Sequence, residues 1–300
     1  MDRPFEWRRL FPMNKQLKIT YHYHSGFSIQ VGSVLLVFDY WEGESRELAP
    51  IGRITPQMLR AYEHIYVFIS HAHPDHLDPV VYTWEGEGLP ITYIVSSDMP
   101  VGTRGKRLAP LQEKELTRDI RVKAFQSTDL GVAFLVTAYG MNIFHAGDLN
   151  LWHWRQESSL REIEAAEQAF YQAVEPIKQS MPIDVAMFPV DPRQGMLYDA
   201  GANHFILTLK PRIFIPMHFQ NRPEVAVDFA RRSRNPQTEV LAMAKPGVTA
   251  HITFGEELLD IHIIEPPKDP DDLPPSPARR PDLPMEDDPF ADTDLPVDLQ

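Results

Sequence analysis

The sequence SHAHPDH at residues 70–76 places three histidines and one aspartate within six residues, directly after a short apolar run. In extended backbone alternate side chains lie on the same side, so His71 and His73 point in one direction. The proline then ends the extended run and lets Asp75 and His76 fold back toward the same point. Imidazole nitrogens and a carboxylate are ligands of Zn, Fe or Mn. The stretch therefore predicts a metal site at the end of a strand.

Short apolar runs on both sides of this motif predict a strand-rich body of mixed α/β type. The expected strands cover residues 17–30, 34–40, 65–69, 91–95, 122–125, 132–139, 141–144, 185–188, 213–215, 251–254 and 259–264. The expected helices cover residues 56–63, 159–179 and 223–231; the first has Thr55 as its cap and Pro56 at its first position. Antiparallel hairpins interleaved with strand–helix units favour a body of stacked layers.

The pattern HxHxDH after a strand resembles the metal-binding motif of the metallo-β-lactamase superfamily. The resemblance extends over residues 17–264. It implies a four-layer αββα sandwich with a mononuclear or binuclear metal site at one edge. Among the branches of the superfamily, the chain most resembles the one that includes ascorbate-phosphate lactonases and many uncharacterised metal-dependent hydrolases. The segments that carry this likeness are HSGF at residues 24–27, HAGD at residues 145–148 and PMHF at residues 216–219.

The resemblance assigns ligands to two metal sites. Asp148 matches the carboxylate that bridges both ions, and His218 matches the final histidine ligand. The second site is then formed by Asp75, His76, Asp148 and His218. Zinc, as one ion or two, is the expected metal, with Mn or Fe as alternatives.

The first site departs from the family pattern. It keeps His71, His73 and Asp148, but Gln126 stands where a third histidine is expected. An amide oxygen is a weaker donor to zinc than imidazole is. We therefore expect the second site to be the tighter one, and the first to be weak, empty or suited to Mn or Fe. Three residues are candidates for a compensating ligand: Asp129, His145 and His153.

Residues beyond the ligand set have two interpretations each. Asp75 or Asp148 is expected to orient the attacking water or to move its proton, whereas His24, His153 and metal-bound water are alternative proton donors to the leaving group. His24 shares one strand face with His22 by alternation, and both are equally consistent with half-buried hairpin positions.

Several neighbours of the motifs are expected to play supporting roles. Trp152 and Trp154 flank His153 and form either a substrate wall or a loop that clamps the long helix. Arg193 binds an anionic substrate or pairs with a nearby carboxylate. Asp39 is expected to brace the metal-binding loop. Two further histidines are expected to be structural or to support the ligands, namely His204 and His145.

These residues predict a metal-dependent hydrolase that acts with a metal-activated water on a small, possibly anionic, molecule. The expected substrates are, in order, a lactone or other cyclic ester, a phosphodiester, and an amide or thioester. A non-catalytic metal-binding or scaffold protein of the same fold is one alternative. A nuclease is another, although the acidic body would repel a polyanion.

Composition bounds the remaining possibilities. The chain has 300 residues and no cysteine, which excludes disulfides and thiolate ligands and suits a cytoplasmic location. The sequence contains no run of 18 apolar residues, so it predicts no membrane-spanning helix.

Residues 1–16 are expected to be a leader that packs on the body. Residues 265–300 carry 11 acidic and 3 basic side chains and are rich in proline, so we expect a disordered acidic tail. The sequence leaves the oligomeric state open.

Overall fold

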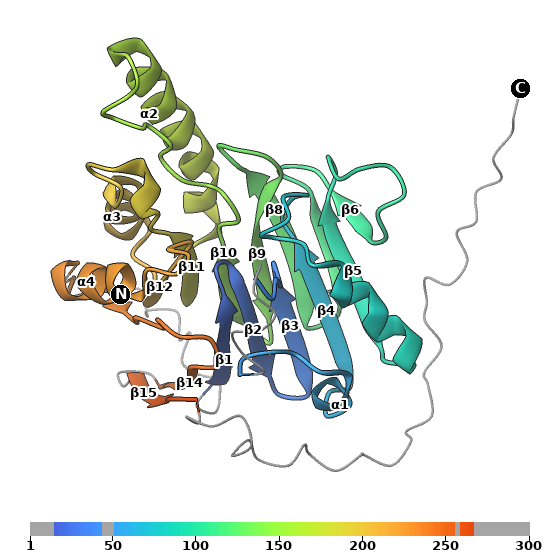
Figure 1. Ribbon diagram of the computed structural model, residues 1–300. Coiled ribbons are helices and arrows are strands. Elements are labelled where there is room, and N and C mark those ends of the chain that lie inside the picture. The colour runs from blue at the N-terminus through green and yellow to red at the C-terminus, as the bar shows by residue number, and fades with distance from the viewer. Residues whose placement is uncertain (1–14, 44–50, 234, 256–258, 267–300) are drawn as a thin grey trace, which may run out of the picture.

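The computed structural model describes residues 15–43, 51–233, 235–255 and 259–266. Two sheets form its centre (Figure 1). The order of strands in the first sheet is β15 (Leu259–Ile264), β14 (Thr249–Phe254), β1 (Lys15–Tyr23), β2 (Gly26–Val31), β3 (Val34–Phe38), β4 (His64–Ile69), β5 (Ile91–Ser96) and β6 (Lys106–Leu108). The order in the second is β13 (Glu239–Val240), β12 (Ile213–Met217), β11 (Val185–Pro189), β10 (Met141–His145), β9 (Val132–Ala138), β8 (Ile120–Gln126) and β7 (Glu113–Thr117).

Helices cover the outer face of each sheet (Figure 1). The first sheet carries α1 (Pro56–Leu59) and the 3-10 helix η2 (Pro79–Glu87). The second carries α2 (Leu160–Val174), η3 (Glu175–Ser180), α3 (Ala200–Leu209) and α4 (Pro223–Arg232). A short 3-10 turn, η4 (Pro192–Gln194), follows β11. The expected four-layer αββα sandwich is therefore confirmed.

Alternation along the parallel strands explains the layers. On β3, Leu36 and Phe38 face the second sheet, whereas Leu35 and Val37 face α1 and η2. The strand β4 alternates in the same way. A strand that buries apolar residues on both faces reads as a continuous apolar run, because neither side meets water. This is why the sequence shows runs rather than a polar–apolar alternation here.

Strand direction brings one set of strand ends to a single edge. The strands β3, β4 and β5 are parallel, and β1 runs in the same direction because it is separated from β3 by the antiparallel β2. In the second sheet β10, β11 and β12 are parallel, and β8 shares their direction across the antiparallel β9. Loops that follow the carboxyl ends of such strands are where α/β proteins place their sites.

Two expected elements are shorter than the sequence predicts. The predicted strand at residues 17–30 is two strands, β1 and β2, because the chain turns at His24 and Ser25. The predicted helix at residues 56–63 ends at Leu59 after a single turn. The sequence analysis also missed α3, which lacks a side-chain cap hydrogen bond.

The long helix is confirmed, with an N-terminus that local chemistry fixes. The Ser159 side chain accepts a hydrogen bond from the Glu162 backbone, and the Glu162 carboxylate accepts one from the Ser159 backbone. This reciprocal capping box satisfies two backbone groups that a helix end would leave free. The helix ends at Val174 and continues as η3.

The leader and the tail stay predictions. Residues 1–14 and 267–300, which include most of both segments, lie outside the described residues. The proposed division into leader, catalytic domain and tail is not tested by the fold. Within the part of the chain that the structure describes, no helix is long and apolar enough to cross a membrane.

The expectation that His22 and His24 share a face is wrong, since the pairing of β1 with β2 shifts register between Tyr21 and Tyr23. The ring of His22 is buried, with Nε2 2.8 Å from Ser28 Oγ and Nδ1 bonded to the Gly52 carbonyl. Burial is the main cause that lowers the pKa of His22 to about 4. His22 therefore stays neutral in the folded protein well below pH 6.5.

This pKa shift predicts an acid-dependent loss of stability. Above pH 6.5 both states hold a neutral His22; below it the unfolded chain takes up a proton that the folded chain does not. The stability difference between the wild type and His22→Gln should therefore shrink by at most about 1.4 kcal/mol per pH unit from pH 6.5 toward 4. Urea unfolding of metal-free protein at several pH values measures it. The exposed His262→Gln variant is the control, and parallel curves for wild type and His22→Gln would contradict the prediction.

Candidate metal centre

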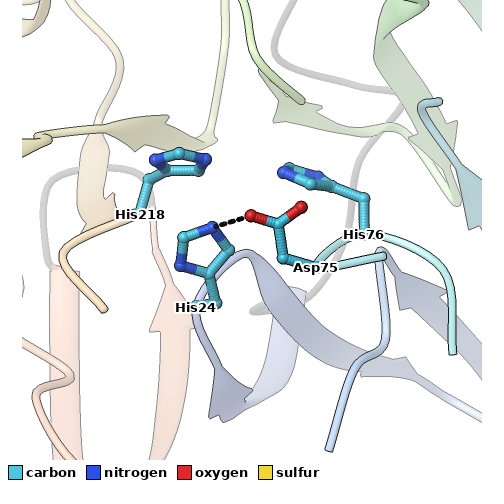
Figure 2. Close-up of side chains that lie close together, drawn as sticks. All are labelled: His24, Asp75, His76 and His218. Atoms are coloured by element: carbon cyan, nitrogen blue, oxygen red, sulfur yellow. Dashed lines mark ion pairs between the residues drawn. The ribbon is translucent and has the colours of Figure 1, made fainter. Parts of the chain in front are cut away.

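Four side chains from three separate regions meet at the edge between the two sheets (Figure 2). They are His24 from the turn after β1, Asp75 and His76 from the loop after β4, and His218 from the end of β12. One ligand atom from each lies within 4.8 Å of the others. The sequence analysis expected three of these as ligands; His24 was expected only as a catalytic candidate.

Asp148 lies at the centre of the histidines. Its Oδ1 is 3.1 Å from His76 Nε2 and 3.2 Å from His218 Nε2, and its Oδ2 is 3.3 Å from His71 Nε2. It follows β10 after Gly147, whose φ of +53° and close approach to Ser70 leave no room for a side chain. One carboxylate thus reaches the histidines of both expected sites, as the bridging position requires.

The two histidines of the second site are each held by a carboxylate on the far side of the ring. His76 Nδ1 is 2.8 Å from Asp39 Oδ2, and His218 Nδ1 is 2.9 Å from Asp191 Oδ2. Such a carboxylate accepts a hydrogen bond from Nδ1–H and leaves the lone pair of Nε2 free to bind a metal. The expectation that Asp39 braces the metal-binding loop agrees with this geometry: Asp39 also accepts hydrogen bonds from the backbone and hydroxyl of Ser70.

The donor atoms fit a cation. Within the described residues, five buried atoms at this point have no hydrogen-bond partner: both ring nitrogens of His24, Nε2 of His76, Nε2 of His218 and Oδ1 of Asp148. Buried polar atoms are almost always paired, because an unpaired one pays its full desolvation cost. Imidazole nitrogens and carboxylate oxygens aimed at one another are a donor set for a divalent metal such as zinc.

The charges of the cluster support the same conclusion. Burial alone would raise the pKa of Asp148, but His76 and His218 outweigh it and hold that pKa well below the usual value. Against the opposing effect of burial, Asp148 raises the pKa of His76 and of His218. A metal ion competes with protons for the ring nitrogens, so its affinity increases with pH.

His24 differs from its neighbours. Burial and then the nearby His218 lower its pKa to about 3, so the ring is neutral at physiological pH. Its Nε2 lies 3.3 Å from Asp75 Oδ2. Burial alone would raise the pKa of Asp75, but the nearby histidines, His24 above all, outweigh burial and lower that pKa, so Asp75 stays ionised. A neutral ring of this kind orients Asp75 or binds metal; it does not carry a proton as imidazolium.

The first site is built differently from the sequence expectation. His71 Nε2 and His73 Nδ1 lie 2.9 Å apart, and Asp148 is next to both. Gln126 is exposed at the end of β8. The carboxylate of Asp129 instead lies within 4.8 Å of the donor atoms of His73 and Asp148.

The other sequence-predicted histidines lie away from the ligand atoms. His145 is buried and stacked on Phe38, with Nε2 2.8 Å from the Ser25 carbonyl, so it supports the turn that carries His24. His204 lies on α3 and packs against the rings of α2. His153 is buried beside the loop at Leu197, and burial lowers its pKa. It is not in any of the three His/Asp clusters of the described chain, and a catalytic role for it stays a prediction.

Aromatic and basic side chains surround the cluster. The ring of Trp152 lies 5.8 Å from that of His218 and stacks on Trp154. Trp41 packs edge-on against His24. Arg193 pairs with Asp191 through Nε and Nη2, as the salt-bridge interpretation predicted, and its side chain is 44% exposed.

Sequence reasoning missed the support of His218 by Asp191 and left Asp129 as one of three compensating candidates. A signal for Asp191 was present: it follows a buried strand at the same edge as Asp148 and His218. Asp39 has the corresponding place after β3, and it was recognised.

No family model matches the chain. It is 27% identical to the UPF0173 metal-dependent hydrolase of Opitutus terrae over 261 residues, covering 79% of this chain and 100% of that protein. It is 23% identical to the UPF0173 metal-dependent hydrolase of Pyrobaculum calidifontis over 248 residues, covering 77% and 98%. The structure is similar to Igni18, a metallo hydrolase from Ignicoccus hospitalis, with a TM-score of 0.58, 19% identity and coverage of 81% and 100%. It is also similar to the metallo-β-lactamase fold protein YhfI from Bacillus subtilis, with a TM-score of 0.50, 13% identity and coverage of 79% and 99%.

The chain has the metallo-β-lactamase fold and is similar over most of its length to UPF0173 metal-dependent hydrolases. The similarity to the solved structures shows the fold. The sequence matches cover nearly the whole length of both relatives. The clusters at the sheet edge are groups of side chains that could hold a metal ion.

The support of His218 by Asp191 gives a testable prediction. Asp191→Asn removes the charge that holds Nδ1 but keeps the shape of the side chain. Loss of such a partner typically costs 10–100-fold in metal affinity, so the zinc dissociation constant of the second site should rise by roughly that factor. Competition with a chromogenic chelator measures it. Asp228→Asn, on the surface of α4, should leave the constant unchanged; equal constants for Asp191→Asn and wild type would refute the role.

Gly131 links the metal loop to the second sheet. Its φ is +74°, and an added Cβ would lie 1.9 Å from the Ser70 carbonyl oxygen and 2.7 Å from His71 Cβ. Gly32 has a similar φ of +59° but open space around it. Both Gly→Ala variants pay the left-handed cost of about 1–2 kcal/mol. Only Gly131→Ala should in addition displace His71, giving a lower melting temperature and less bound metal per chain. Equal losses in the two variants would rule out this close contact as a determinant of the site.

Proposed function

We propose that the chain hydrolyses a small ester or lactone, with a phosphodiester as the next class, and that zinc occupies the site of His76 and His218. The observation that carries this proposal is the set of buried, unpaired donor atoms around Asp148. A bound divalent ion supplies two things to hydrolysis: it lowers the pKa of water, and it polarises the oxygen of the electrophile. A lactonase-like activity agrees with the branch that the sequence resembles.

Asp75 is the carboxylate that we propose to orient the attacking water. Its side chain is 30% exposed, whereas that of Asp148 is 6% exposed and surrounded by three histidines. An ionised carboxylate that is open to solvent can accept a hydrogen bond from the attacking water, and His24 Nε2 lies 3.3 Å from this carboxylate. Asp148 would then act as a ligand only.

The surroundings favour a small substrate with an apolar part. Trp152 and Trp41 lie beside His218 and His24, so flat apolar surface borders the metal ligands. Arg193 has Nε and Nη2 bound to Asp191, and we propose its Nη1 for an anionic group of the substrate. Burial of aromatic surface beside a few polar groups is the usual composition of a small-molecule site.

The charge of the site argues for low substrate charge. Five aspartates lie in or around the clusters, namely Asp39, Asp75, Asp129, Asp148 and Asp191. Two divalent ions together with Arg193 would balance these five carboxylates and leave no excess positive charge for a polyanion. We therefore propose a small molecule rather than a nucleic acid. A cytoplasmic location remains a prediction from the cysteine-free sequence.

Hydrolysis of a substrate panel tests the proposal. Metal-loaded protein is assayed with γ- and δ-lactones, nitrophenyl esters and bis(nitrophenyl) phosphate. We expect turnover of a lactone or ester that disappears with a chelator and returns with zinc. Asp148→Asn should reduce kcat by roughly 1,000-fold or more, because the carboxylate shared by both sites loses its charge.

The surface variant Asp228→Asn is the matched control and should keep the wild-type rate. Turnover that survives both chelation and Asp148→Asn would come from a contaminant or another site. Full metal binding with no turnover of any of the three substrate classes would favour the non-catalytic scaffold instead.

A further inference from the structure

The segment 127–131, between β8 and β9, lies against the first metal site. We propose that Asp129, and not Gln126, completes this site together with His71, His73 and Asp148. We further propose that the resulting set of two imidazoles and two carboxylates takes Mn²⁺ or Fe²⁺ in preference to zinc. The inference concerns metal binding and stands apart from the choice of substrate.

The position of Asp129 supports its role as a ligand. Asp129, His73 and Asp148 each offer an atom within 4.8 Å of the others, which is the spacing of ligands around one ion. Gln126, the residue at which a third histidine was expected, closes the strand β8 with an exposed side chain. A carboxylate three positions later is therefore available to take the place of that histidine.

Contacts on both sides fix the segment that carries Asp129. Thr128 Oγ1 donates to the Asn150 carbonyl and accepts a hydrogen bond of 3.0 Å from the Asn150 amide, two residues after Asp148. On the other side the Val132 amide donates to the Ser70 carbonyl at 3.1 Å, directly before His71. The segment that carries Asp129 is thus hydrogen-bonded on both sides of this residue to the loops that supply the other ligands. These contacts hold the Asp129 carboxylate near those ligands before metal binds.

The donor types set the metal preference. Carboxylate oxygens suit Mn²⁺, and two histidines with carboxylate are a common ligand set of non-haem Fe²⁺, whereas zinc sites favour nitrogen and sulfur. The first site has two carboxylates among its four side chains. The second has the same numbers in Asp75, Asp148, His76 and His218, but it adds His24 as a third imidazole, with a ring nitrogen within 4.8 Å of ligand atoms of Asp75, His76 and His218. The two halves of the centre therefore differ in hardness, and a mixed pair of metals follows.

Manganese binding measured by electron paramagnetic resonance tests the inference. Full-length protein is stripped of metal, loaded with one equivalent of zinc to fill the second site, and titrated with Mn²⁺ while the signal of free Mn²⁺ is recorded. We expect one further equivalent to bind. Asp129→Asn should raise the Mn²⁺ dissociation constant by at least the roughly 10–100-fold that loss of an outer partner costs, and Gln126→Ala should leave it unchanged.

A reciprocal variant sharpens the test. Asp129→His supplies a third imidazole, so a second equivalent of zinc should bind and displace Mn²⁺. Asp119→Asn, an exposed residue in the turn between β7 and β8, controls for the loss of a negative charge. Because Asp129 is exposed, Asp129→Asn is expected to fold, and its circular dichroism should match that of the wild type.

Three results would overturn the inference: an unchanged Mn²⁺ constant in Asp129→Asn, a weakened constant in Gln126→Ala, or no binding of Mn²⁺ to the zinc-loaded wild type. None of these would by itself contradict hydrolysis, because a mononuclear zinc site at His76 and His218 could still turn over substrate. Conversely, a substrate panel without turnover would leave the metal titration valid. The failures of the two proposals are therefore distinguishable.

Discussion

A buried carboxylate that must stay ionised is the constraint on which the site depends. Asp39 lies at the end of β3 with 1% of its surface exposed, and such a charge is costly unless hydrogen bonds replace its water. Ser70 supplies two of these bonds from the end of β4, and His76 supplies a third. The same bonds fix the start of the metal-binding loop and aim the free nitrogen of His76. The hydrogen bonds that stabilise the buried Asp39 carboxylate therefore also position a metal ligand.

The second sheet repeats this arrangement. Asp191, after β11, holds His218, after β12, just as Asp39 holds His76. Asp148 lies between the two histidines and completes a symmetric pair of carboxylate–histidine units around one shared carboxylate. Against the opposing effect of burial, the two rings hold the pKa of Asp148 below its usual value, and Asp148 raises the pKa of each ring. A divalent ion would bind the same ring nitrogens and carboxylate oxygens and would place a compact positive charge between them.

The apolar sandwich makes such a charged edge possible. The parallel strands bury both faces, so their polar residues can lie only where the strands end. All strands that lead into the site run in one direction, and their carboxyl ends meet at one edge. Three residues there take left-handed backbone conformations, at φ of +53° for His24, +40° for Asp39 and +65° for His218. Such conformations cluster at functional sites, where surrounding structure outweighs their cost.

The sequence by itself determined the local features: the motif at residues 70–76, the capped helix α2, most buried strands, and the likeness that pointed to Asp148 and His218. These are readable because apolar periodicity and short spacings are local properties of a chain. Tertiary structure alone decided the rest. Alternation failed at His24 because a turn and a register shift interrupt β1 and β2. Asp129 lies beside His73 and Asp148, and Asp191 supports His218, because contacts between loops of different strands fix those positions. Such contacts join residues far apart in the chain, so local patterns can name these residues as candidates but cannot show which side chains they meet.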